Sequence, residues 1–143
     1  MKADPFPKDN CGKKECDMRD CGEKCYQGNV NYDLVCKMCE SEGREKHVYM
    51  GESSRGCFSR GKQHREAYKS ESGFMWEHDV REHGGRKNVE FEMKLIARDK
   101  DPMRRIIRES VRIMNGRKNG VKLMNRKDEW FGIKTVQVNF ELD

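Results

Sequence analysis

The pattern of apolar and polar positions predicts a small domain of strands and helices over residues 29–143. Strict alternation of apolar and polar residues predicts strands over residues 89–95 and 136–142, and a similar pattern predicts one over residues 30–36. Residues 47–51 form a further strand candidate. We expect it to pair with residues 30–36 as a hairpin whose connection holds two cysteines.

Apolar residues at helical spacing predict three helices, over residues 53–69, 74–83 and 102–115. Gly84 and Gly85 are expected to end the second helix. The third begins at a cap and a proline, and it carries an apolar stripe of the kind that faces a core. The stripe residues are Met103, Ile106, Ile107, Ser110, Val111 and Met114, and the opposite face carries Arg104, Arg105, Arg108 and Arg112. The predicted fold class is α/β (α+β), a small mixed sheet flanked by helices.

Residues 1–28 form a separate segment that is polar, rich in cysteine and nearly free of aliphatic side chains. Such a segment cannot bury a core, so it needs a metal to fold. Six of the seven cysteines fall between residues 11 and 39, namely Cys11, Cys16, Cys21, Cys25, Cys36 and Cys39. Their odd total and the lack of an export signal favour structural Zn²⁺ over disulfides.

Only Cys36 and Cys39 have the C-x2-C spacing that suits one tetrahedral ion. Six thiolates could also hold two ions, so the choice of ligands stays open. His78 and His83 are five residues apart, which is a poor same-face pair in an α-helix. We therefore expect the cysteines to supply the ligands.

Charge and hydropathy narrow the classes of partner. Lys and Arg total 30 against 25 Asp and Glu, a net charge of +5, which points weakly toward a polyanion such as DNA. No apolar run approaches the ~18 residues of a membrane span, so an integral membrane protein is excluded. The absence of a signal-peptide pattern argues against secretion.

Two features of the helices suggest phosphate chemistry. Arg60 and His64 stand four residues apart on one helical face, shortly after Tyr49. Taken alone, such a pair on a basic helix is usually part of a solvated surface. Glu109 is the only carboxylate between Arg104 and Arg117. It could pair with a neighbouring arginine, or it could hold a divalent cation near a phosphate that the arginines attract.

The order of these features resembles the GIY-YIG nuclease domain, with a similarity that covers roughly residues 29–130. The stretches 48–55 and 60–64 are similar to the version carried by Penelope-like retroelements, and 74–78 and 123–130 also resemble such copies. The catalytic residues that the resemblance implies are Tyr32, Tyr49, Gly51, Arg60, His64, Glu109 and Asn125.

The resemblance implies a role for each of these side chains. Either Tyr32 or Tyr49 would be the general base for water, and Arg60 would stabilise charge on the phosphate. His64 would assist proton transfer, and Glu109 would hold Mg²⁺ or Mn²⁺. Two further residues would support the site, Asn125 by hydrogen bonds and Gly51 by permitting close approach. The candidate DNA-binding residues are Arg55, Arg104, Arg105, Arg108 and Arg112.

The sequence therefore predicts a metal-dependent DNA endonuclease of a mobile element. Its nick would supply a 3′ end for target-primed reverse transcription. A reverse transcriptase domain and element RNA would be its partners, with no membrane, in the nucleus or elsewhere inside the cell. The alternatives are a zinc-stabilised nucleic-acid-binding module with a silent nuclease fold, or a free-standing repair or viral nuclease.

Overall fold

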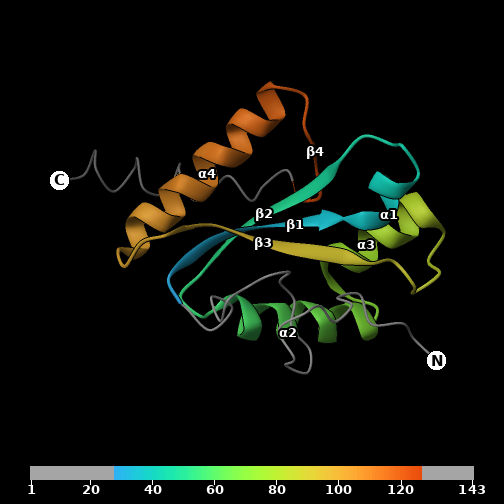
Figure 1. The fold of residues 1–143 in the computed structure, drawn as a ribbon, viewed down its shortest axis with the longest axis horizontal. Coiled ribbons are helices and arrows are strands. Elements are labelled where there is room, and N and C mark those ends of the chain that lie inside the picture. The colour runs from blue at the N-terminus through green and yellow to red at the C-terminus, as the bar shows by residue number, and fades with distance from the viewer. Residues whose placement is uncertain (1–27, 127–143) are drawn as a thin grey trace.

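A computed structural model describes residues 28–126, and it arranges them as a four-stranded sheet with helices on both faces (Figure 1). The strands are β1 (Val30–Cys36), β2 (His47–Ser53), β3 (Phe91–Arg98) and β4 (Lys122–Leu123). The helices are α1 (Lys37–Ser41), α2 (Cys57–Lys69), α3 (Gly73–His78) and α4 (Pro102–Lys118), with a π-helical turn at Asp79–His83 directly after α3. The predicted mixed sheet flanked by helices is confirmed.

The sheet has the strand order β3-β1-β2-β4. The central strand β1 is antiparallel to both of its neighbours, and β2 is parallel to β4. The predicted hairpin is confirmed, with Tyr32 opposite Gly51 and Leu34 opposite Tyr49. Because β4 pairs only with His47 and Val48, the rest of β2 has no strand partner on that side among residues 28–126.

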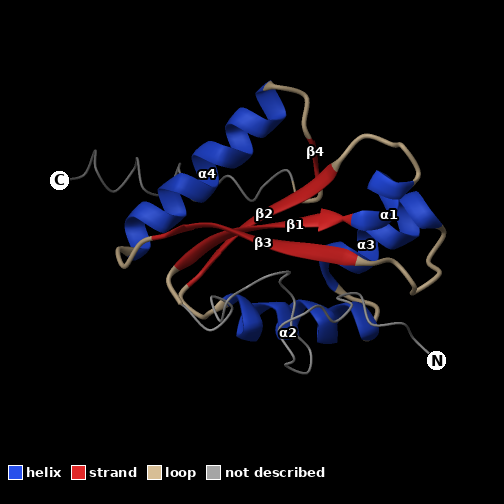
Figure 2. Ribbon diagram, viewed as in Figure 1, coloured by secondary structure: helices blue, strands red, loops and turns tan. Residues whose placement is uncertain are grey.

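Each face of the sheet packs on its own apolar core. The larger core lies on the α2 side, where Tyr32, Leu34 and Phe91 pack with Tyr68. The smaller core lies on the α4 side, where Val35, Val48, Met50 and Ile113 meet. Figure 2 shows the three long strands between these two helices. This division follows from the alternation of side chains along β1 and β2.

Helix α4 begins where the sequence predicts, but the face that it turns toward the sheet differs from the predicted one. The Asp101 side chain caps the helix by accepting a bond from the Met103 N–H at 2.9 Å. The expected core stripe is wrong in part, because Met103, Val111 and Met114 are 41–46% exposed. Arg105, expected on the opposite face, is buried instead. The sheet face that packs against α4 carries the carboxylates of Asp33 and Glu52. Their ion pairs with Arg112 and Arg105 set which face of α4 is buried.

No helix among residues 28–126 is long and apolar enough to cross a membrane. The segment 1–28 with its four cysteines at positions 11, 16, 21 and 25 lies almost wholly outside the described residues, as does the strand predicted over residues 136–142.

Candidate functional site

The first side-chain cluster lies between the β1–β2 hairpin and α2. The Tyr32 hydroxyl is 2.8 Å from Nε2 of His64, and Nε of Arg60 donates to the same hydroxyl at 3.3 Å. Because the oxygen accepts from Arg60, its own proton is available for the imidazole. Arg60 and His64 reach Tyr32 together because they lie one turn apart on α2.

An aromatic pair stands beside this chain of hydrogen bonds. The rings of Tyr49 and Phe74 are stacked, with centroids 3.7 Å apart and planes within 6°. The His64 ring meets both of them edge-on, at 5.8 and 4.9 Å. Phe74 comes from α3 and Tyr49 from β2, so the stack joins that helix to the unpaired part of the strand.

Burial divides the two tyrosines of the cluster. Tyr32 is fully buried, and its pKa is raised far above the ordinary value, chiefly by burial, with smaller contributions from Tyr49 and Glu109. Burial and the nearby Arg60 lower the pKa of His64 to about 3, so its imidazole is neutral at physiological pH. Tyr49 is partly exposed, so it is the tyrosine of this cluster with solvent access.

Gly51 on β2 and Asn125, two residues after β4, support the same region. A Cβ at Gly51 would lie 2.4 Å from Cζ of Tyr32, so only glycine fits the tyrosine ring at this point. The Asn125 amide pairs with the backbone of Met50 twice, accepting from its N–H and donating to its carbonyl, both at 2.9 Å. The side chain thus continues the hydrogen bonding of β4 along β2.

Six of the seven predicted catalytic residues are joined by these contacts, directly or through the β2 backbone, around the point where Tyr32 lies opposite Gly51. Glu109 lies on α4, and the structure relates it to this group only through the influence of its charge on the pKa of Tyr32. The structure thus brings together residues from β1, β2, α2 and the segment after β4.

The predicted DNA-binding arginines of α4 form ion pairs with carboxylates of the same chain. Arg105 bonds Glu52 at 3.2 Å, and Arg112 lies 2.8 Å from Asp33. The other two both contact Asp99, Arg104 at 2.9 Å and Arg108 at 3.4 Å. Of the five candidates, Arg55 and Arg104 are exposed, and the other three are buried or half-buried.

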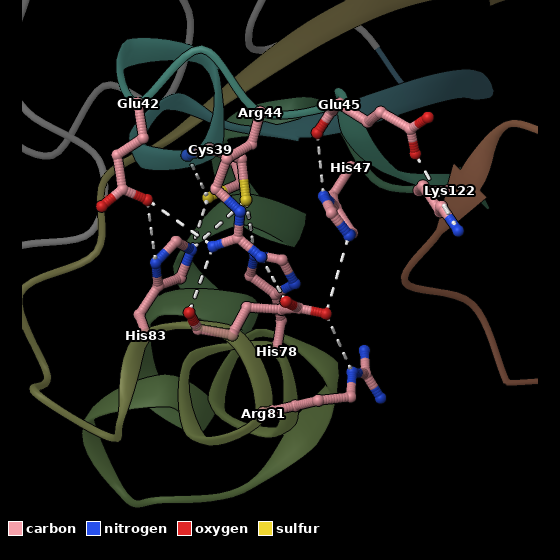
Figure 3. A network of polar contacts seen from close by, with 11 residues as sticks. Cys39, Glu42, Arg44, Glu45, His47, His78, Arg81, His83 and Lys122 are labelled. Atoms are coloured by element: carbon pink, nitrogen blue, oxygen red, sulfur yellow. Dashed lines mark hydrogen bonds and ion pairs between the residues drawn. The ribbon is translucent and has the colours of Figure 1, made fainter.

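The second cluster is a candidate metal centre with two cysteines and two histidines. The ligand atoms of Cys36, Cys39, His78 and His83 lie within 4.8 Å of one another, and all four residues are buried. The Cys39 sulfur is 3.5 Å from Nε2 of His78 and 3.3 Å from Nε2 of His83, and the Cys36 sulfur is 3.4 Å from the latter. Figure 3 shows both imidazoles reaching toward Cys39 from the helical segment below.

These separations suit a tetrahedral zinc ion. Zn–S and Zn–N bonds of about 2.3 and 2.0–2.1 Å place sulfur and nitrogen roughly 3.6 Å apart across a tetrahedron. The other ring nitrogen of His83 lies 3.6 Å from the Glu42 carboxylate, the outer partner that zinc-bound histidines commonly have. The four residues could therefore hold a metal ion such as zinc.

Local backbone geometry assembles this centre. Cys36 ends β1 and caps α1, and its sulfur accepts from the Cys39 N–H at 3.4 Å. The π-helical turn bonds residues five apart, as Gly84 N–H to Asp79 O shows, and so brings His78 and His83 to one side. The buried Asp79 carboxylate fixes this turn by accepting from the Tyr68 hydroxyl at 2.7 Å and from the Lys87 N–H at 2.9 Å.

The protonation states fit a cation. Burial, with the neighbouring Cys36, raises the pKa of Cys39 to about 12, and Arg44 acts in the opposite direction. Two buried thiols held against neutral imidazoles need a positive ion before they ionise together. Burial, together with His47 and His83, lowers the pKa of His78 to about 3. The ring is therefore neutral, and one of its two nitrogens carries no proton.

The prediction that cysteines alone supply the ligands is corrected for Cys36 and Cys39, which are joined by two histidines. An α-helix would separate His78 from His83, but the π-helical turn does not. The sequence spacing could have indicated these ligands. Cys36-x2-Cys39 followed by His78-x4-His83 falls within the range of spacings found in zinc sites.

Comparison with family models, with curated proteins and with solved structures gives no match to this chain.

Proposed function

We propose that the chain is a divalent-metal-dependent endonuclease that nicks DNA, with a zinc centre that braces its fold. The observation that carries the proposal is the chain of hydrogen bonds from Arg60 through Tyr32 to His64, beside a partly exposed Tyr49. A guanidinium, a neutral imidazole and a tyrosine at one solvent-accessible edge are groups that phosphodiester hydrolysis uses.

Tyr49 is the better candidate for activating water. Tyr32 is fully buried and its raised pKa opposes ionisation, so it suits a positioning role toward His64. Tyr49 has solvent access, and its hydroxyl interacts with the Arg60 guanidinium. A partly exposed hydroxyl held by a guanidinium is placed where it can exchange a proton with an attacking water.

Glu109 is the candidate ligand for a catalytic cation. Its carboxylate is half-buried and close enough to act on the Tyr32 hydroxyl, and a hard oxygen donor suits Mg²⁺ or Mn²⁺. Such an ion binds through one or two carboxylates together with water and phosphate oxygens. When bound, it would supply charge stabilisation at the leaving oxygen, complementing Arg60 on the phosphate.

The mobile-element part of the proposal rests on the resemblance to Penelope-like retroelements. Under it, the nick provides a 3′ end that a reverse transcriptase domain extends on element RNA. This would take place in the nucleus or elsewhere inside the cell.

The test is a time course of supercoiled-plasmid nicking with Mg²⁺ or Mn²⁺. We expect wild type to nick, and we expect Glu109→Gln, Arg60→Ala and Tyr49→Phe to reduce the rate at least 100-fold. Lys118→Gln is the matched control, because this exposed residue lies on α4 away from the cluster. Circular dichroism and zinc content verify that each variant is folded.

Two results would contradict the proposal. Folded, zinc-loaded wild type that binds DNA and leaves it intact with either cation would favour the silent binding module instead. Glu109→Gln with wild-type nicking would remove the cation ligand from the mechanism.

A further inference from the structure

We propose that a basic groove beside this cluster holds the phosphodiester backbone of the DNA next to the cleaved position. This inference rests on the proposed function, and it names a surface that the sequence did not suggest. The groove is a hollow of about 450 Å³ between the α3 end, β4 and the C-terminal end of α4. Its charged lining consists of Arg81, Arg117, Lys122, Arg126, Glu77 and Glu82.

Four cations converge on the groove from separate parts of the fold. Arg81 comes from the π-helical turn, Arg117 from α4, Lys122 from β4 and Arg126 from the residues after it. Three of these side chains, Arg81, Lys122 and Arg126, are 57–63% exposed, so their charged ends are open to a ligand. Figure 3 shows Lys122 to the right of His47 and Arg81 below it. Cations gathered from distant segments form a surface that a flexible anionic chain can follow.

The groove continues directly from the candidate site. His47 lines it and lies two residues before Tyr49 on β2, so the two side chains emerge on the same face of the sheet. Glu77 lines it one helical turn after Phe74, the residue stacked on Tyr49. Asn125 lines it while its amide holds the Met50 backbone. A strand whose phosphate meets Tyr49 and Arg60 therefore has its next phosphates at the groove.

The two carboxylates do not cancel this surface. Glu77 bonds Arg126 at 2.7 Å, but this pair is exposed, so exchange of the carboxylate for a phosphate costs little. One oxygen of Glu82 forms a short ion pair with Arg44, which lies outside the groove lining, and the other lies 3.7 Å from Nε of Arg81. This second contact is long, and Arg81 is exposed, so a phosphate can take its place at little cost. The cations therefore outnumber the carboxylates, and the imbalance favours an anion.

Arg105 and Arg112 of α4, two of the arginines predicted to bind DNA, are poorer candidates for this role. Arg105 and Arg112 already pair with Glu52 and Asp33 at the sheet, and both pairs are largely shielded from solvent. A phosphate would have to separate such a pair and leave a carboxylate without its cation, which is costly. Phosphate contacts are therefore expected on the groove side of the molecule.

The experiment measures DNA affinity of the full, zinc-loaded chain between 50 and 200 mM salt. The variants are Arg81→Gln, Lys122→Gln and their combination. Lys100→Gln is the control for an equal loss of charge elsewhere, because this exposed residue precedes α4 and does not line the groove. Each groove substitution should weaken binding and lower the slope of log affinity against log salt by about 0.9, and the double variant by about twice that. The control should keep the wild-type slope. Zinc content is measured throughout, because Arg81 lies between the candidate ligands His78 and His83 in the sequence.

The outcomes separate the groove from the nuclease. Unchanged slopes in both groove variants, with wild type nicking normally, would overturn the groove and leave the nuclease standing. Reduced slopes in a protein that never nicks would keep the groove as a DNA surface and remove the nuclease. Tighter binding of RNA than of DNA of the same sequence, with the same loss in the variants, would overturn DNA as the occupant.

Discussion

Replacing Gly51 with alanine tests whether the contact between β2 and Tyr32 sets the geometry of the cluster. An added Cβ would lie 2.4 Å from Cζ and 2.6 Å from the hydroxyl oxygen of Tyr32. Ordinary contacts between such atoms are about 3.5–4.0 Å. The ring must therefore move by roughly 1 Å, and it is fully buried.

That movement also affects the hydrogen bonds at the Tyr32 hydroxyl. They measure 2.8 Å to His64 and 3.3 Å to Arg60, so a shift of this size takes at least one beyond bonding range. Overpacking costs about 1–3 kcal/mol, and a buried polar group left without its partner costs a similar amount. We expect a total loss of roughly 2–5 kcal/mol, which is a large part of the 5–15 kcal/mol typical of a domain.

The assay is urea unfolding of the zinc-loaded chain, with the midpoint and slope followed by circular dichroism. Gly116→Ala on α4 is the matched control. An added Cβ there would lie 3.5 Å from the nearest side-chain atoms, which is an ordinary van der Waals distance. That change should stabilise the protein by about 0.5–1 kcal/mol, since alanine favours a helix. A wild-type urea midpoint for Gly51→Ala, or a midpoint shifted in the same direction as that of Gly116→Ala, would show that the Tyr32 ring does not depend on glycine at this position.

Three further predictions concern the metal centre, pH and α4. Cys39→Ser should remove one equivalent of bound zinc, measured by mass spectrometry of the native protein, whereas Cys57→Ala should leave the zinc content unchanged. Because burial and Arg60 lower the pKa of His64 from 6.5 to about 3, its contribution to stability is present above pH 6.5 and is lost as the pH falls toward 3. Urea midpoints of His64→Gln should therefore decline less steeply than wild type across that window, and parallel curves would contradict this. Arg105→Met should cost about 1–3 kcal/mol in urea unfolding, with an unchanged salt slope for DNA binding, and Lys100→Met should cost little.

Local patterns predicted most of the sheet and its hairpin. Alternation in β1 and β3 was strong because each strand has one face on the α2 core, where burial selects apolar side chains. The Asp101-Pro102 start of α4 and the glycines after the π-helical turn also follow from local chemistry. These features depend on a few neighbouring residues, so a single sequence is sufficient to find them.

The orientation of α4 could not be predicted in this way. Its apolar residues cover more than one face, with Ile113 buried under the helix and Met114 46% exposed. The sheet surface beneath presents Asp33 and Glu52, and these select Arg105 and Arg112 for the inner face. Such a choice depends on residues more than 50 positions away, so helical periodicity does not contain it.

The metal centre and the tyrosine cluster share their supports, which explains how one fold can hold both. Strand β1 carries Tyr32 and ends at Cys36, and α3 carries Phe74 and ends at His78. An ion joining Cys36 to His78 would therefore fix the distance between the strand and the helix that bracket Tyr49. A metal cross-link at this place would add rigidity to the packing of the larger apolar core. The four candidate metal ligands lie outside the proposed active site, and an ion bound there would set the frame in which Arg60, Tyr32 and His64 meet.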